Sequence, residues 1–113
     1  MRLPFTDPAD CLADDPFLID ARKPPARAAS GRGVAGALTI DPLAFGHAEA
    51  EALLTEIGRD RPVTVFCVHG HEVSQYLCAL LLVHGGKARY VRGGFEALET
   101  APPPGLKIAE ITP

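Results

Sequence analysis

The stretch Val63–Ser74, which reads VTVFCVHGHEVS, decides the fold of this chain. Four consecutive apolar or β-branched residues, Val63 to Phe66, lead directly into Cys67, and a short polar loop with one glycine follows. A helix-like run, Gln75–His84, comes next. This order predicts a buried strand, a tight loop and a helix N-terminus, with the cysteine at the carboxyl end of the strand.

Cys67 is the first candidate for a nucleophile. Open α/β sheets carry their reactive groups at the carboxyl ends of their strands. A thiol that faces a helix N-terminus meets unpaired backbone N–H groups and the positive end of the helix dipole, so its thiolate form is favoured. The alternative is a packed core cysteine, which the polar loop directly after Cys67 disfavours.

Length and composition predict one globular domain. The chain has 113 residues, of which 47% are hydrophobic, so it can bury a core of its own. Its formal net charge of −3 lacks the excess of positive charge that is typical of nucleic-acid-binding domains. The run Gly85-Gly86-Lys87 is not a phosphate-binding signature, because its partner glycine would fall at Leu81. We therefore expect neither a nucleic-acid partner nor a cofactor.

Cysteine usage and hydropathy indicate a compartment. Three cysteines, an odd number, do not form a disulfide framework. The N-terminal residues lack the apolar core of a signal peptide, and the longest apolar run, Leu77–Val83, is too short to span a membrane. The expected setting is a reducing cytoplasm, with no membrane partner.

Apolar runs and turn signals predict strands that alternate with helices along the chain. The expected strands are Phe17–Ile19, Ala37–Ile40, Val63–Phe66 and Ala88–Val91, with a possible last extended piece at Leu106–Ile111. The expected helices are a short one near Pro8, one that starts near Phe45 or Gly46 and ends at Gly58, Gln75–His84, and Phe95–Thr100; Lys23–Gly33 is expected to be a loop or a broken helix. Such alternation predicts an α/β fold with a parallel sheet covered on both faces.

Four stretches, in this order, resemble rhodanese-like domains. They are Leu18–Arg22 (LIDAR), Arg32–Ala37 (RGVAGA, with Ala35 where the family usually has proline), Phe66–Gly70 (FCVHG) and Arg92–Phe95 (RGGF). The resemblance implies a single rhodanese-like domain over residues 1–113, with a central parallel five-stranded sheet and helices on both faces. It also implies a sulfurtransferase or persulfide carrier, in which Cys67 holds sulfane sulfur. The donor would be thiosulfate-like or a small-molecule or protein persulfide, and the acceptor a thiol or cyanide.

The loop after Cys67 is the expected persulfide-binding site. Backbone N–H groups turned inward by a tight loop form an anion nest, and Gly70 permits the turn. The candidate residues of this loop are Val68, His69, Gly70, His71, Glu72 and Val73. His69 and His71 could donate to the persulfide or move a proton, or they could be solvated loop residues. The alternating C-x-H-x-H pattern lacks the second ligand pair of a structural zinc site, so we expect no metal.

Glu72 departs from the pattern of thiosulfate-using relatives, many of which carry arginine five residues after the cysteine. The serine or threonine that often follows is Val73 here, while Ser74 comes one place later. A carboxylate in the first turn of a helix is favourable, so Glu72 could be only a helix-capping charge. The alternative is that Glu72 repels a dianionic donor such as thiosulfate and favours a thiol-borne persulfide.

The remaining candidates are supporting residues. Asp20 and Arg22 lie at a neighbouring strand end, where the resemblance implies an ion pair or hydrogen-bond clamp. Cys11 and Cys78 are expected to be packing residues of the core.

Two other function classes remain open. A rhodanese-like fold can serve as a non-catalytic interaction module, although such a module would not need Cys67. Phosphatases and arsenate reductases of similar fold need an arginine six residues after the cysteine to grip an oxyanion, and Val73 occupies that position.

Overall fold

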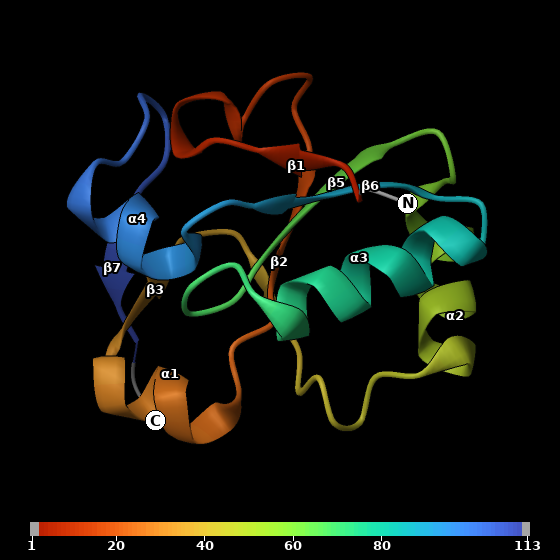
Figure 1. Ribbon diagram of the computed structural model, residues 1–113, viewed down its shortest axis with the longest axis horizontal. Helices are drawn as coiled ribbons and strands as arrows, with labels where there is room; N and C mark the ends of the chain where they lie inside the picture. Colours follow the sequence, from red (N-terminus) through yellow and green to blue (C-terminus); the bar gives the residue numbers. More distant parts are fainter. Residues whose placement is uncertain (1–2, 112–113) are drawn as a thin grey trace.

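Five parallel strands form the main sheet of the computed structural model, which describes residues 3–111 (Figure 1). The strands are β1 (Phe5–Thr6), β2 (Phe17–Asp20), β4 (Leu38–Thr39), β5 (Pro62–Phe66) and β6 (Lys87–Val91), and their order in the sheet is β1-β6-β5-β2-β4. The strand that leads into Cys67 is therefore the central one, as the sequence predicts.

The central position of β5 follows from its side chains. Val63 to Phe66 are all buried. Val63 and Val65 pack into one hydrophobic cluster and Phe66 packs into a second, so both faces of the strand are covered. The polar member, Thr64, is satisfied: its hydroxyl donates to the Cys11 carbonyl (3.2 Å) and accepts from Arg89 Nε (3.0 Å). A strand with no solvent face of this kind is typical of parallel sheets.

Four α-helices of the described residues surround the sheet: α1 (Pro24–Ser30), α2 (His47–Ile57), α3 (Glu72–Val83) and α4 (Gly94–Thr100). Buried residues of α2 and α3 share one cluster with Val63 and Val65, whereas those of α4 share the other cluster with Phe66. The prediction of an α/β domain with helices on both faces is confirmed. Figure 1 shows α1 and α4 on the side of the molecule toward which β5 runs, with the loop after β5 between α4 and the start of α3.

Two segments differ from the expected elements. The expected loop or broken helix at Lys23–Gly33 contains a regular helix, α1, because its two prolines lie at the first helical positions, where proline is tolerated. It ends at Gly31, whose φ is +66°. The last extended piece is shorter than Leu106–Ile111. Its strand β7 (Ile108–Glu110) lies outside the main sheet and pairs antiparallel with β3 (Arg32–Val34), a strand that the sequence did not predict.

Three smaller outcomes concern helix ends and the first residues. α3 begins at Glu72, three residues before the expected start. The expected helix near Pro8 is one 3-10 turn, Pro8–Asp10, whose N-cap Asp7 makes no side-chain capping bond. The short strand β1, at the edge of the sheet beside β6, is not among the strands that the sequence predicts. No helix within residues 3–111 is long and apolar enough to cross a membrane.

Candidate active site

Cys67 follows the last residue of β5 and lines a cavity of about 270 Å³. The thiol-bearing residue is buried, with 6% of its surface exposed, and it forms part of the cavity wall. The cavity brings together two strand ends, because β2 pairs with β5 so that Asp20 lies opposite Phe66. Its lining residues are Ala21, Arg22, Lys23, Ala26, Cys67, Val68, His69, His71, Glu72 and Val73.

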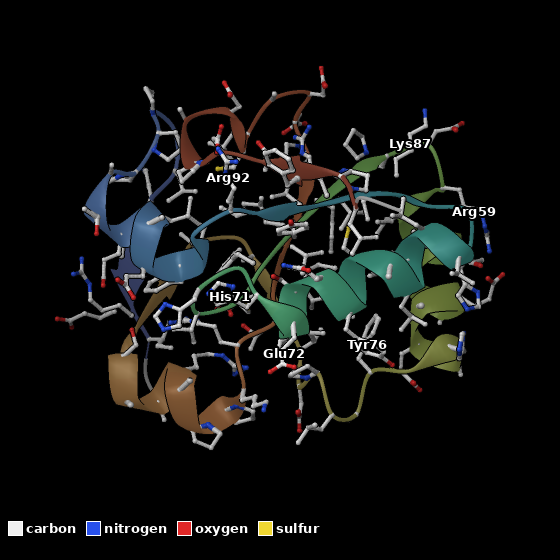
Figure 2. The ribbon with its side chains drawn as sticks, in the orientation of Figure 1. Arg59, His71, Glu72, Tyr76, Lys87 and Arg92 are labelled. Carbon is white, nitrogen blue, oxygen red and sulfur yellow. The ribbon has the colours of Figure 1, made fainter. Side chains whose placement is uncertain are left out.

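Most of the predicted loop residues therefore meet around one cavity. Val68, His69, His71, Glu72 and Val73 line it with Cys67, whereas Gly70 does not. Figure 2 shows His71 and Glu72 at the start of α3, where the loop turns into the helix. Arg22 also lines the cavity, and Asp20 does not.

In the part of the chain that the structure describes, the Cys67 thiol has one side-chain hydrogen-bond partner, Ser74. The Sγ–H group donates to Ser74 Oγ at 3.2 Å, and Ser74 Oγ in turn lies 3.4 Å from the His71 carbonyl. Ser74 is the third residue of α3 and is completely buried. When the sulfur is a thiolate, the same contact allows the Ser74 hydroxyl to donate to it. Ser74 was not among the predicted site residues, although its place in the first helical turn after the loop was a usable signal.

The backbone of the loop offers unpaired donors. Within residues 3–111, the N–H groups of Val68 to Val73 find no hydrogen-bond acceptor. Two of these groups belong to the first turn of α3, where helix geometry leaves N–H groups free. A run of free N–H groups beside a thiol is suited to holding an anion.

Gly94 and Phe95, from the RGGF stretch, fix the base of the loop. The Phe95 N–H donates to the Cys67 carbonyl at 2.7 Å, and the Glu96 N–H donates to the Val68 carbonyl at 3.2 Å. A Cβ on Gly94 would lie 2.5 Å from the Cys67 carbonyl oxygen, so only glycine permits this approach. The N-terminus of α4 therefore holds the cysteine backbone directly.

Gly70 fixes the tip of the loop. Its φ is +75°, and a Cβ there would lie 2.4 Å from the Val91 carbonyl oxygen and 2.9 Å from the Gly93 nitrogen. Backbone atoms of β6 and of the following turn therefore require a residue without a side chain at this position.

Asp20 and Arg22 form a buried ion pair beside the site. Arg22 Nη2 lies 2.7 Å from Asp20 Oδ2, and Arg22 Nε donates to Asp20 Oδ1 at 3.0 Å. Arg22 also donates to the Arg32 carbonyl at 2.8 Å, and its guanidinium lies 4.0 Å from the centre of the Phe95 ring. All these contacts tie β2, β3 and α4 together, so the guanidinium is already engaged by the protein.

The two loop histidines have different surroundings. His69 Nδ1 lies 3.0 Å from Glu96 Oε2, so a residue of α4 orients this ring. His71 is the N-cap residue of α3, and its ring centre lies 6.1 Å from that of His69. Both rings are exposed and border the Cys67 cavity. No group of three or more His, Cys, Asp or Glu side chains in the described part of the chain is placed to hold a metal ion.

Lys23 is a cavity residue that the sequence did not single out. It follows Arg22 at the end of β2 and is the N-cap residue of α1. Its position could have been predicted, because the carboxyl ends of parallel strands meet at one edge of a sheet and Lys23 follows such a strand end. Glu72, which the sequence did single out, is the first residue of α3 and is exposed, as the first-turn prediction requires.

Cys11 and Cys78 lie in the core. They are 1% and 0% exposed, and neither lines the Cys67 cavity, which confirms the packing prediction. Burial raises the pKa of the Cys11 thiol, an effect that Arg89 partly offsets. Burial alone raises the pKa of the Cys78 thiol to about 12. Both residues therefore stay neutral thiols near pH 7.

Comparisons with solved structures support the fold. Thiosulfate sulfurtransferase from Pseudomonas aeruginosa is 19% identical with a TM-score of 0.67, over 94% of this chain and 19% of that one. The As-Sb reductase from Leishmania major is 12% identical with a TM-score of 0.73, over 96% and 93% of the two chains. A yeast protein tyrosine phosphatase of the rhodanese family is 15% identical with a TM-score of 0.71, over 89% and 87%. At these identities the likeness concerns the fold alone.

Sequence comparison identifies the family. A search of curated proteins gives no significant match. The family model described as the rhodanese-like domain matches residues 7–101, which is most of the chain. The chain therefore belongs to the family of rhodanese-like domains.

Proposed function

We propose that this chain is a sulfurtransferase that carries sulfane sulfur as a persulfide on Cys67. The observation that carries the proposal is the surroundings of the thiol. Cys67 borders a cavity, meets the Ser74 hydroxyl, and lies in a loop whose N–H groups from Val68 to Val73 have no acceptor within residues 3–111. These donors match a Cys-S–S⁻ anion, which needs several hydrogen bonds and little space.

The reaction has two displacement steps. In the first, the Cys67 thiolate attacks the outer sulfur of a donor R–S–SH; a new S–S bond forms, the donor S–S bond breaks, and the donor leaves as a thiolate. In the second, an acceptor thiolate or cyanide attacks the terminal sulfur, and the bond to Cys67 breaks, which restores its thiolate. Ser74 and the loop N–H groups stabilise the sulfur anion in both steps. His69, oriented by Glu96, is suited to move the proton of the donor or the acceptor.

Oxyanion chemistry is the weaker candidate for this chain. Phosphatase or arsenate reductase activity on such a loop needs a guanidinium that grips two oxygens at once. Val73 stands where the loop would supply that arginine, and the neighbouring Arg22 is already paired with Asp20. The similar reductase and phosphatase structures therefore inform the fold of this chain more than its reaction.

The test is intact-mass analysis after exposure of the reduced protein to a persulfide donor, with Cys67→Ser and Cys78→Ser as a matched pair. The wild type and Cys78→Ser should each gain one sulfur atom that cyanide or a thiol then removes, while Cys67→Ser should gain none. A Cys67→Ser protein that still loads and delivers sulfur at the wild-type rate would show that Cys67 is not the carrier. A wild type that takes sulfur from no donor would favour the interaction-module alternative.

A further inference from the structure

The cysteine loop, residues 67–71, is held through its carbonyl groups. The Cys67 and Val68 carbonyls accept from backbone N–H groups of α4 at 2.7 and 3.2 Å, and the His71 carbonyl accepts from a backbone N–H of α3 at 3.1 Å. Figure 1 shows the loop between these two helices. The C=O and N–H groups of a trans peptide point in opposite directions, so each carbonyl that is held also fixes the direction of the next N–H group.

The Gly70 carbonyl is held by a side chain instead of the backbone. It accepts from the amide Nε2 of Gln75 at 3.2 Å. Gln75 lies in the first turn of α3, and its own backbone N–H is the donor to the His71 carbonyl. One residue of α3 therefore holds two successive carbonyl groups of the loop, one with its backbone and one with its side chain.

This side-chain bond lies at a surface of the loop other than the one that borders the Cys67 cavity. Gly70 and Gln75 line another hollow, of about 690 Å³, which Cys67 does not line, and neither of them lines the Cys67 cavity. His71 lines both hollows. The Gly70 carbonyl is turned toward Gln75, so the N–H group of the same peptide, which belongs to His71, is turned away from Gln75.

We infer that Gln75 is a positioning residue of the persulfide site: its amide holds the Gly70 carbonyl and thereby turns the His71 N–H group toward the sulfur that Cys67 carries. This inference rests on the proposed function. Glycine restricts its backbone angles less than any other residue, so without the bond from Gln75 the peptide after Gly70 has more freedom to rotate. The sulfur anion then loses a donor of fixed direction.

The experiment follows the backbone amide of His71 by NMR while Cys67 takes up sulfur from cysteine persulfide, and intact mass measures the rate of loading. Hydrogen bonds to a charged acceptor are shorter and stronger than those to a neutral one. The amide proton of His71 should therefore move downfield when the wild-type protein is loaded.

Two variants at position 75 separate the donor from the rest of the side chain. Gln75→Met keeps the length of the side chain but removes its N–H donor. Loading should slow about fivefold, the effect of one neutral hydrogen bond, and the downfield shift of the His71 amide should decrease. Gln75→Lys keeps an N–H donor and should restore the shift.

Thr6→Val is the matched control. The Thr6 hydroxyl also donates to a backbone carbonyl, that of Asp7 at 3.1 Å, and Thr6 lines neither hollow. The substitution should change neither the loading rate nor the His71 shift.

The outcomes separate the inference from the function. A wild-type His71 amide that does not move on loading would overturn the inference and leave Cys67 as a persulfide carrier. The same conclusion would follow if Gln75→Met loaded at the wild-type rate, or loaded slowly with an unchanged His71 shift. A wild-type protein that takes sulfur from neither this donor nor any other persulfide would overturn both.

Discussion

Cys67 and Cys78 are almost equally buried, at 6% and 0% exposure, yet their surroundings differ in kind. Cys67 lies at a strand end, next to a hydroxyl, a cavity and a loop with free N–H groups. Cys78 lies inside α3 among apolar side chains, and its sulfur makes a long hydrogen bond of 3.9 Å to the Pro4 carbonyl. A buried surface fraction alone would not tell the two residues apart. The polar groups and the opening around the thiol do.

The same contrast holds between the backbones of the two regions. In α3 the amide groups beyond the first turn are used by the helix itself, and nothing is left for a ligand. In the loop before α3, the backbone packs closely against Gly94, Phe95 and the end of β6, while its own N–H groups have no acceptor among the described residues. An anion site on a small domain thus depends on neighbouring segments that support the loop.

The largest expected effect is on thiol reactivity. A thiol with a pKa of about 12 has roughly 10⁻⁴ of its population as thiolate at pH 8, so Cys78 should be alkylated on the order of 10³ times more slowly than a free cysteine. Its rate should still rise tenfold per pH unit above pH 9. Peptide mapping after brief treatment with iodoacetamide at pH 8 should find Cys67 modified before Cys78 and Cys11.

The matched control is the unfolded protein, in which all three thiols should react alike, because burial no longer raises the pKa of Cys11 or Cys78. If native Cys78 reacted as fast as native Cys67, the contrast between the two regions would be lost.

The second effect concerns the support of the loop. Gly70→Ala places a Cβ against the Val91 carbonyl and forces a non-glycine residue to φ +75°. Gly36→Ala has a similar φ of +85° but no atom within 4 Å of the new Cβ, so it isolates the conformational strain. Gly36→Ala should cost about 1–2 kcal/mol of stability, and Gly70→Ala about 2–3 kcal/mol more, because backbone atoms have to move.

Urea denaturation of both variants measures the loss in free energy of unfolding. The rate of sulfur loading on Cys67 shows whether the loop still supports the active site. Gly70→Ala should lose most of its loading, whereas Gly36→Ala should keep it. If the two substitutions lowered the free energy of unfolding equally, the loop would be able to move away from β6 without loss of stability, and contact with β6 would not fix its conformation.

Much of the fold could be predicted because its decisive segments are apolar and short. The run from Val63 to Phe66 has no polar face, which suits only the middle of a parallel sheet. β3 and β7 are different: RGV and IAE carry no periodic pattern, and their pairing joins residues that are far apart in the chain. Local sequence holds little information on such a pair.

The site divides in the same way. The cysteine loop is one continuous segment, so its residues were found from their positions after Cys67. Lys23 reaches the cavity only because β2 and β5 are neighbours in the sheet, and Ser74 reaches the thiol only because α3 begins at Glu72. Both depend on strand order or on an element boundary, which residue patterns define poorly.

The smallest expected effect is that of the Ser74 hydroxyl, and it tests whether the contact with Cys67 matters. Ser74→Ala removes one hydrogen-bond partner of the sulfur, and the free N–H groups of the loop remain. A single hydrogen bond to a charged group is worth about 1.5–3 kcal/mol at most, and the remaining donors should compensate for part of it. We therefore expect sulfur loading of Cys67 to slow about fivefold to tenfold, which corresponds to roughly 1–1.4 kcal/mol.

Thr64→Val is the matched control, since it removes an equally buried hydroxyl that contacts the Cys11 carbonyl and Arg89 instead of Cys67. It should lower the melting temperature without slowing the loading step beyond that loss of stability. If the two variants slowed loading equally, the Ser74 hydroxyl would be a packing group of α3, and the loop N–H groups alone would hold the sulfur anion.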